Sequence, residues 1–185
     1  MSAAAELLER SGFDGMTMDG VARGAGTNKN AIYRRFPDRL GLGIEAYRRS
    51  ATAWQPPDTG SLRSDVLTAL RQANRHWDSP LGRALRELMT AAASAGVDLL
   101  QQLDLHTSQV EFWSTIVERA AHRGELAVVA RPSRVLTTAI ALLRHEFLVR
   151  SGPEVDDAAI LEIVDLVYLP LLSGSPDTSS RLDGE

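Results

Sequence analysis

The chain has 185 residues, enough for one or two domains with a substantial core. Hydrophobic residues make up 44% of it, and no apolar run is long enough to cross a bilayer, so the composition favours a soluble globular protein without a membrane partner. The absence of cysteine excludes disulfides and thiolate metal sites. The first residues show no secretory leader pattern, and we expect a cytoplasmic protein.

The net charge of -4 is unevenly distributed along the chain. Residues 1–50 carry eight Arg or Lys against six Asp or Glu, a net charge of +2, whereas the remainder carries twelve Arg against eighteen acids, a net charge of -6. A polyanionic partner would therefore meet the N-terminal part, and a generally basic coating protein is excluded.

Residues 3–37 predict three short helices. The first covers residues 3–10 and ends at Gly12. The second is capped by Thr17 and ends near Gly26, because glycine accepts the left-handed conformation that closes a helix. Asn28 caps the third, which directs Ile32 and Phe36 inward and stops at Pro37. Two short helices joined by a tight turn predict a helix-turn-helix, whose second helix enters the major groove of DNA.

The outward face of the third helix carries side chains that suit DNA. Lysine donates to guanine O6 and N7, asparagine bonds adenine, and arginine suits phosphates. The predicted DNA-binding residues are Thr17, Asn28, Lys29, Asn30, Tyr33, Arg34, Arg35 and Arg39.

These residues also carry a family resemblance. Residues 12–39, GFDGMTMDGVARGAGTNKNAIYRRFPDR, resemble the DNA-binding domain of TetR-type transcriptional regulators, with Tyr33, Phe36 and the Pro-Asp-Arg that follows as the most specific part. The close match covers roughly the first fifty residues. The resemblance implies an all-α fold, with a three-helix DNA-binding domain at 1–50, a helical ligand-binding and dimerisation domain at 60–173, and a flexible tail at 174–185.

Several glycines depart from the family pattern. Gly20 and Gly24 each weaken the second helix by ~1 kcal/mol relative to alanine, and the first helix is shorter than the family's, so no contact from a preceding arm is predicted. Asp38 caps a fourth helix that runs towards Ala53. Its glycines, Gly41 and Gly43, either loosen the helix to assist a switch or allow close packing.

The remaining chain predicts further helices after the turn at residues 55–60. Ser61 caps one of them, and Pro80 takes the first position of the next. A long helix begins near Val97 or near Ser108 and ends at Arg123 with Gly124 beyond it. A helix over 133–149 is closed by Ser-Gly-Pro at 151–153, and a last one starts at Asp156 or Asp157 and contains Pro170, which is expected to kink or shorten it.

The last two helices are apolar on more than one side, which indicates either a partner or a buried position in a monomer. The resemblance implies that they pair with their two-fold mates in a homodimer. The predicted dimer-interface residues are Leu136, Ile140, Leu143, Phe147, Ile160, Val164, Val167, Tyr168 and Leu171.

A ligand pocket in the helical body is a further expectation. Its candidates are Trp77, Met89, Phe112, Trp113 and His145, each of which also suits plain core packing. The histidines do not pair at helical spacing, no nucleophile turn or phosphate loop occurs, and we predict no enzyme activity, no metal and no cofactor.

The prediction is thus a dimeric repressor that binds a palindromic operator in double-stranded DNA and is released by a small apolar or aromatic effector. An activator or dual regulator fits the same residues. A helical interaction protein with a degenerate DNA-binding head is the alternative from another class, and a helical enzyme is a distant third.

Overall fold

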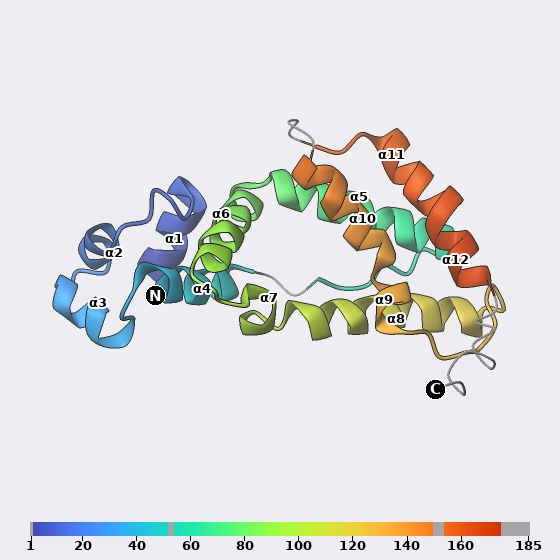
Figure 1. Ribbon diagram of the computed structural model, residues 1–185, viewed down its shortest axis with the longest axis horizontal. Coiled ribbons are helices and arrows are strands. Elements are labelled where there is room, and N and C mark those ends of the chain that lie inside the picture. Colours follow the sequence, from blue (N-terminus) through green and yellow to red (C-terminus); the bar gives the residue numbers. More distant parts are fainter. Residues whose placement is uncertain (1, 52–53, 150–153, 175–185) are drawn as a thin grey trace, which may run out of the picture. The chain divides into compact units, whose positions relative to one another are not determined.

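The structure is a computed structural model that describes residues 2–51, 54–149 and 154–174. These residues form helices and connecting segments without a strand, so the all-α prediction is confirmed. In chain order (Figure 1) the helices are α1 (Ser2–Ser11), α2 (Met18–Gly24), α3 (Lys29–Arg35), α4 (Arg39–Ser50), α5 (Leu62–Asp78), α6 (Pro80–Ser94), α7 (Leu99–Gln102), α8 (Leu105–His122), α9 (Ser133–Leu136), α10 (Thr138–Val149), α11 (Asp157–Glu162), the π-helical segment η1 (Ile163–Tyr168) and α12 (Leu169–Ser173).

The chain divides into two compact units. The N-terminal unit consists of Met1–Gln55 and Ala73–Gln109, and the C-terminal unit consists of Pro56–Gln72 and Val110–Glu185. Residues 73–109 join the N-terminal unit because α6 packs against α1 and α4. The predicted domains, 1–50 and 60–173, instead assign residues 73–109 to the C-terminal domain. Apart from Gly174, the predicted tail at 174–185 lies outside the described residues, as does the predicted Ser-Gly-Pro stop at 151–153.

Side-chain caps begin the helices where the sequence predicts them. In α2, α3 and α4 the capping oxygen accepts a hydrogen bond from the backbone N–H three residues later, at 3.0, 2.9 and 2.7 Å. The confirmed caps are Thr17, Asn28, Asp38, Ser79 before Pro80, and Asp156. Gly26 closes α2 with a φ of +60°, the left-handed conformation that the predicted turn requires.

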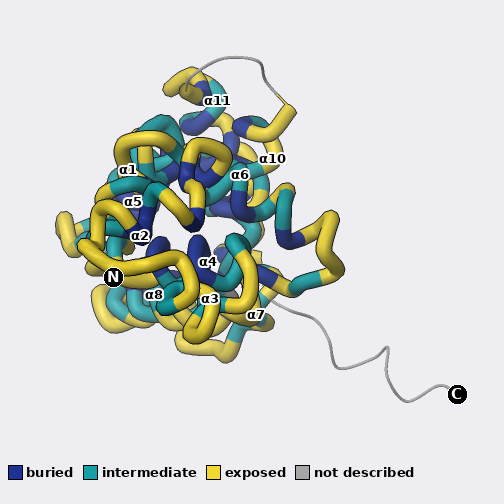
Figure 2. Tube along the Cα trace, turned by 90° about the vertical axis from the view of Figure 1, so that its left-hand side faces the viewer, coloured by how far each residue is buried: buried dark blue, intermediate teal, exposed yellow. Residues whose placement is uncertain are grey.

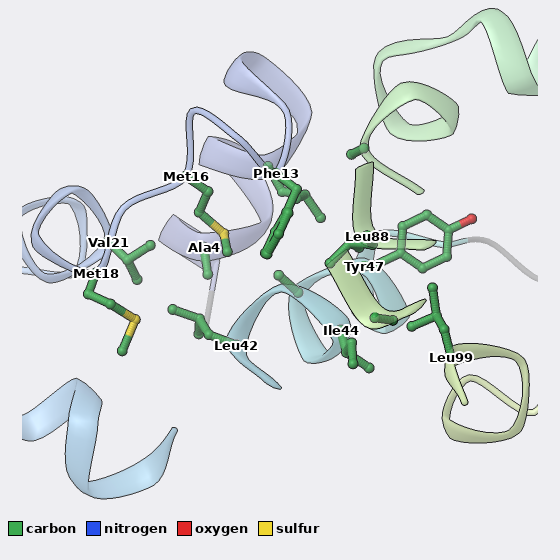
Figure 3. Packing of buried hydrophobic residues seen from close by; sticks show 14 residues of the cluster. Ala4, Phe13, Met16, Met18, Val21, Leu42, Ile44, Tyr47, Leu88 and Leu99 are labelled. Carbon is green, nitrogen blue, oxygen red and sulfur yellow. The ribbon is translucent and has the colours of Figure 1, made fainter. Parts of the chain in front are cut away.

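The core of the N-terminal unit lies between α1, α4 and α6 (Figure 3). Leu8, Phe13, Met16, Leu42 and Leu88 are all essentially inaccessible to solvent within it. The first two come from α1 and the loop that follows it, and Leu88 comes from α6. The helix-turn-helix is therefore supported by a core to which residues far along the chain contribute.

Two glycines that weaken α2 in isolation have a packing reason. A Cβ at Gly20 would lie 3.1 Å from Leu7 Cδ2, and a Cβ at Gly24 would lie 3.2 Å from Ala3 Cβ. Any larger residue at these positions would require Leu7 or Ala3 of α1 to shift by a few tenths of an ångström. The glycines are thus explained by close helix contact, and they no longer favour a degenerate DNA-binding head.

Gly43 and Gly41 of α4 differ in the space around them, and this difference predicts opposite effects of alanine. A Cβ at Gly43 would lie 2.7 Å from the Phe13 ring and 2.9 Å from Leu88 Cδ2, and Figure 3 shows both side chains over α4. We expect Gly43→Ala to lower the free energy of unfolding by about 1–3 kcal/mol through overpacking.

Gly41→Ala is the matched control, because its nearest neighbour, Asp38 Oδ1, would lie at an ordinary 3.4 Å. The alanine there should be neutral or should raise the free energy of unfolding by up to ~1 kcal/mol through helix propensity. Urea unfolding of the two variants checks both expectations, and equal effects would contradict the packing explanation for Gly43.

Two predicted helices are interrupted in the structure. The long helix before Gly124 is divided into α7 and α8 by Asp104, whose φ of 52° is left-handed. The helix predicted over 133–149 breaks at Thr137 into α9 and α10. The hydroxyls of Thr137 and Thr138 donate to the carbonyls of Ser133 and Arg134, at 2.9 and 2.7 Å. Such hydrogen bonds to the preceding turn bend helices.

An aromatic cluster fills the centre of the C-terminal unit. Trp113 of α8 and Tyr168 of η1 are buried and meet edge to face, with ring centroids 5.8 Å apart. The Tyr168 hydroxyl donates to the Leu136 carbonyl at 2.7 Å, beside the break between α9 and α10. Burial raises the pKa of Tyr168 well above its ordinary value, so the hydroxyl remains a donor.

The last helix continues past Pro170 instead of ending there. Residues 163–168 are π-helical and Pro170 lies in the first turn of α12, so the wider turn precedes the residue that lacks an N–H. The described helical run reaches Ser173. The kink or shortening predicted for Pro170 is thus replaced by a π-helical segment before it.

Two bidentate ion pairs attach α5 to this last helical run. Arg63 binds Asp165 through two contacts of 2.7 Å, and Arg71 binds Asp157 at 2.7 and 2.8 Å. The guanidinium groups lower the pKa of both carboxyls. The pairs connect α5 to both α11 and η1.

Candidate nucleic-acid interface

Helix α3 packs on the N-terminal unit through one edge only. None of its residues is buried (Figure 2), while Ile32 and the following Phe36 are half-buried against the core cluster, as predicted. Helix α2 lies against α3 and contributes the buried Met18 and Val21. The rest of the α3 surface faces solvent, which is the arrangement that a recognition helix requires.

The structure brings most of the predicted DNA-binding residues together on this surface. Exposed side chains on α3 and at its cap are Asn28, Lys29, Asn30, Tyr33, Arg34 and Arg35. Thr17 is also exposed, and its hydroxyl caps α2. Donors for base edges and donors for phosphates therefore lie together on the exposed surface of the helix-turn-helix. Their contacts with DNA remain predictions.

Lys29 begins α3 and is held by a residue of α2. Its Nζ lies 3.1 Å from Asp19 Oδ2 and 5.8 Å from the centroid of the Tyr33 ring. The hydrogen bond and the charge of Asp19 raise the pKa of Lys29 above its ordinary value, so the ammonium is charged at neutral pH. The site thus contains a carboxylate beside its predicted base-reading lysine.

Arg39 has a structural role in addition to the predicted phosphate contact. Its guanidinium lies 4.3 Å from the Phe13 ring centroid, and Nη1 donates to the carbonyls of Phe13 and Asp14 at 3.3 and 3.2 Å. The same loop is held from α6, where the Glu87 carboxylate accepts from the N–H groups of Phe13 and Asp14, at 2.5 and 3.0 Å. Arg39 and Glu87 together fix the loop that leads into α2.

Asp19 and Glu87 contact residues of this site, and the sequence did not predict either of them there. Asp19 stands ten residues before Lys29, and a spacing across a turn gives no periodic signal. Glu87 is 74 residues from Phe13. Both contacts are decided by how the helices pack.

The predicted ligand-binding residues do not share one environment. Trp77 and Met89 are half-buried in the N-terminal unit, whereas the other three candidates belong to the C-terminal unit. There, Trp113 is buried in the aromatic cluster, Phe112 is half-buried against it and His145 is exposed. An open depression of about 320 Å³ is lined by Asp14, Arg86, Glu87, Thr90 and Ala91, and none of the candidates lines it.

The predicted dimer-interface residues differ in their exposure within the single chain. Seven of the predicted residues are buried within the single chain and form its own core: Leu136, Ile140, Leu143, Phe147, Ile160, Val164 and Tyr168. The exposed apolar side chains of the last helical run are instead Leu166, Val167 and Leu171, with exposed fractions of 73, 42 and 42%, and Leu148 and Val149 are exposed at the end of α10. Helices lie in both predicted regions, although the first is broken at Thr137 and the second contains a π-helical segment, and their outward faces could not be predicted from the sequence.

Two other kinds of site, a membrane-spanning helix and a metal centre, are absent from the part of the chain that the structure describes. No helix there has the length and apolar character to cross a membrane. Within the same residues, no cluster of three or more histidine, aspartate or glutamate side chains is arranged to hold a metal ion.

Comparisons with known proteins agree with this geometry. Residues 1–46 match the family model of bacterial regulatory proteins of the tetR family, and residues 56–167 match the tetracyclin repressor-like C-terminal domain. The crystal structure of the TetR family transcription regulator SCO0332 is similar, with a TM-score of 0.69, 27% identity, and coverage of 94% of this chain and 95% of that chain.

Relatives of similar length carry regulator names. HTH-type transcriptional regulator AqdR of Rhodococcus erythropolis is 28% identical over 90% of this chain and 81% of its own length. The DNA-binding transcriptional repressor TetR of Mycobacteroides abscessus is 29% identical over 93% of this chain and 91% of its own length. An uncharacterized HTH-type regulator of Mycobacterium tuberculosis, Rv1556, is 28% identical over 95% of this chain and 87% of its own.

The two matched domains cover most of the chain, and the exposed face of α3 stands where a helix-turn-helix presents its recognition helix. The chain therefore belongs to the TetR family of DNA-binding transcriptional regulators.

Proposed function

We propose that this protein is a homodimeric repressor that binds a palindromic operator and is released by a small apolar or aromatic molecule. The exposed polar face of α3, with Lys29, Asn30, Tyr33 and Arg34, is the observation that carries the proposal. Lysine and asparagine are base-reading side chains, and the neighbouring arginines suit phosphates. The Mycobacteroides abscessus relative is named a transcriptional repressor, which supports repression rather than activation.

Dimerisation is supported by the apolar side chains that the single chain leaves uncovered. We define the dimer patch as Leu166, Val167 and Leu171. Exposed apolar surface of this kind marks an interaction site, and a second copy of the chain supplies the two heads that two half-sites require.

Release by an effector requires that the ligand bind one form of the dimer more tightly than the other. Phe112, Trp113 and His145 of the C-terminal unit remain its proposed contacts, whereas the other two candidates, Trp77 and Met89, belong to the N-terminal unit. Because Trp113 is buried in the aromatic cluster, the effector would contact its ring only after local rearrangement.

The proposal is tested by footprinting the protein at moderate salt on the DNA upstream of its own gene. We expect a roughly symmetric protected site. Lys29→Ala should weaken binding to that site roughly tenfold to a hundredfold, which corresponds to the loss of about 1–3 kcal/mol from one specific base contact.

Arg10→Ala is the matched control, because it removes an exposed cation from the end of α1, away from α3. It should leave the footprint unchanged. Normal binding by Lys29→Ala would contradict the assigned recognition helix, and a transcription assay in which the bound protein raises expression would replace repression with activation.

A further inference from the structure

Asp19 places a negative charge on the surface that is proposed to face DNA. It lies in the first turn of α2, and its side chain is 61% exposed, while that of Lys29 is 48% exposed. Phosphate oxygens would repel this carboxylate. An acidic residue here therefore opposes binding to DNA of any sequence, unless its charge also makes a favourable interaction within the protein.

The ion pair between Asp19 and Lys29 orients the lysine ammonium. With Asp19 at 3.1 Å and the Tyr33 ring on another side, the Lys29 ammonium is directed by two neighbours on the same surface. An ammonium has three N–H donors, so it can bind Asp19 and still donate to a base edge. A contact with a phosphate would instead have to compete with the carboxylate, which carries the same charge as the phosphate.

We propose that Asp19 is a specificity-determining residue of this regulator, which holds Lys29 in an ion pair available to bases but withheld from nonspecific phosphates. This inference rests on the proposed DNA-binding function. Binding to random DNA depends on phosphate neutralisation, so the pair lowers nonspecific affinity more than operator affinity. Exposed ion pairs are weak, and Asp19 therefore changes the ratio of operator to nonspecific affinity without preventing DNA binding.

A purely structural role makes a different prediction. Asp19 also lies where a negative charge favours the start of a helix, so its loss as a helix-stabilising group would lower stability and DNA affinity together. The proposed role requires the reverse effect on random DNA, where removing the carboxylate should raise the affinity.

The experiment measures the affinity of the full chain for a duplex of random sequence over a range of salt concentrations. Asp19→Asn should steepen the slope of log K against log salt by about 0.9, the value for one added phosphate contact, and raise the affinity roughly eightfold at 0.1 M salt. The affinity of Asp19→Asn for the footprinted operator should rise less than its affinity for random DNA. The ratio of specific to nonspecific affinity should therefore fall.

Two comparisons isolate the role of the pair. Glu9→Gln makes the same charge change at an exposed position on α1 and should leave the slope unchanged. In a Lys29→Gln background, Asp19→Asn should raise the affinity for random DNA no more than Glu9→Gln does. Far-UV circular dichroism checks that each variant is folded, and Asp19→Ser repeats the test with a second uncharged polar side chain.

Each remaining outcome contradicts the inference. An unchanged slope, a loss of affinity in folded Asp19→Asn, or an equal gain with and without Lys29 would show that the ion pair does not control selectivity. A wild-type protein that binds neither random DNA nor its upstream region would instead overturn the proposed function, and this inference with it.

Discussion

Replacement of Leu166 by aspartate is expected to convert the proposed dimer into a monomer. Leu166 is the most exposed residue of the dimer patch, and Val167 beside it is also exposed. A carboxylate in the centre of an apolar interface would lose its hydration without gaining a partner, and such burial is strongly unfavourable. Sedimentation velocity at micromolar concentration measures the change in mass.

The same substitution should also weaken operator binding by roughly 100-fold or more. A monomer presents one head, so it loses the effective concentration by which the first bound head assists the second. The surface of α3 is unchanged in the variant, and binding to random DNA should fall much less. Operator affinity is measured on the footprinted site.

Leu100→Asp is the matched control for this prediction. Leu100 is an exposed leucine of α7, outside the dimer patch, and it undergoes the same chemical change. Its variant should remain dimeric and bind the operator normally. A dimeric Leu166→Asp protein would show that the exposed side chains of the last helical run are not the interface.

Trp113→Ala is expected to destabilise the C-terminal unit by about 3–5 kcal/mol. Trp113 is 2% exposed and meets both Phe112 and Tyr168 edge to face. Its removal would leave a cavity beside Tyr168, whose hydroxyl is fixed on Leu136 and whose ring cannot follow without breaking that hydrogen bond. Urea or thermal unfolding gives the change in free energy.

Phe112→Ala provides the comparison within the same helix. Phe112 is half-buried, so its loss should cost about 1–2 kcal/mol. Equal costs for the two variants would contradict the central place of Trp113 in this core. A large cost for Trp113 alone would favour core packing over pocket lining, the two readings that its sequence position leaves open.

The helix-turn-helix could be predicted from sequence because its signals are local. Thr17, Asn28 and Asp38 cap their helices through residues three positions away, and Gly26 makes the turn between two of them. Interactions over so few residues can be recognised from the residue types and their spacing along the chain. The exposed polar face of α3 follows from the same periodicity, which also places Ile32 and Phe36 against the core.

The outward faces of the last two helices could not be predicted in the same way. Both are apolar on more than one side, so periodicity does not distinguish the side that meets the chain's own core from the side that meets a partner. Tyr168 is buried and fixed on Leu136, whereas neighbouring Val167 is exposed. The π-helical turn before Pro170 has more residues per turn than an α-helix, so the residues there point in directions that an α-helical projection does not predict.

The sequence by itself therefore determined the starts of the capped helices, the helix-turn-helix and the family, because caps, turns and motif spacing act within a few residues. The tertiary structure decided the partners of Lys29 and Phe13, the close contacts at Gly43, and the exposed face of the last helix. These features depend on which helices pack together, and packing joins residues as far apart as Phe13 and Glu87 whose spacing along the chain carries no local signal.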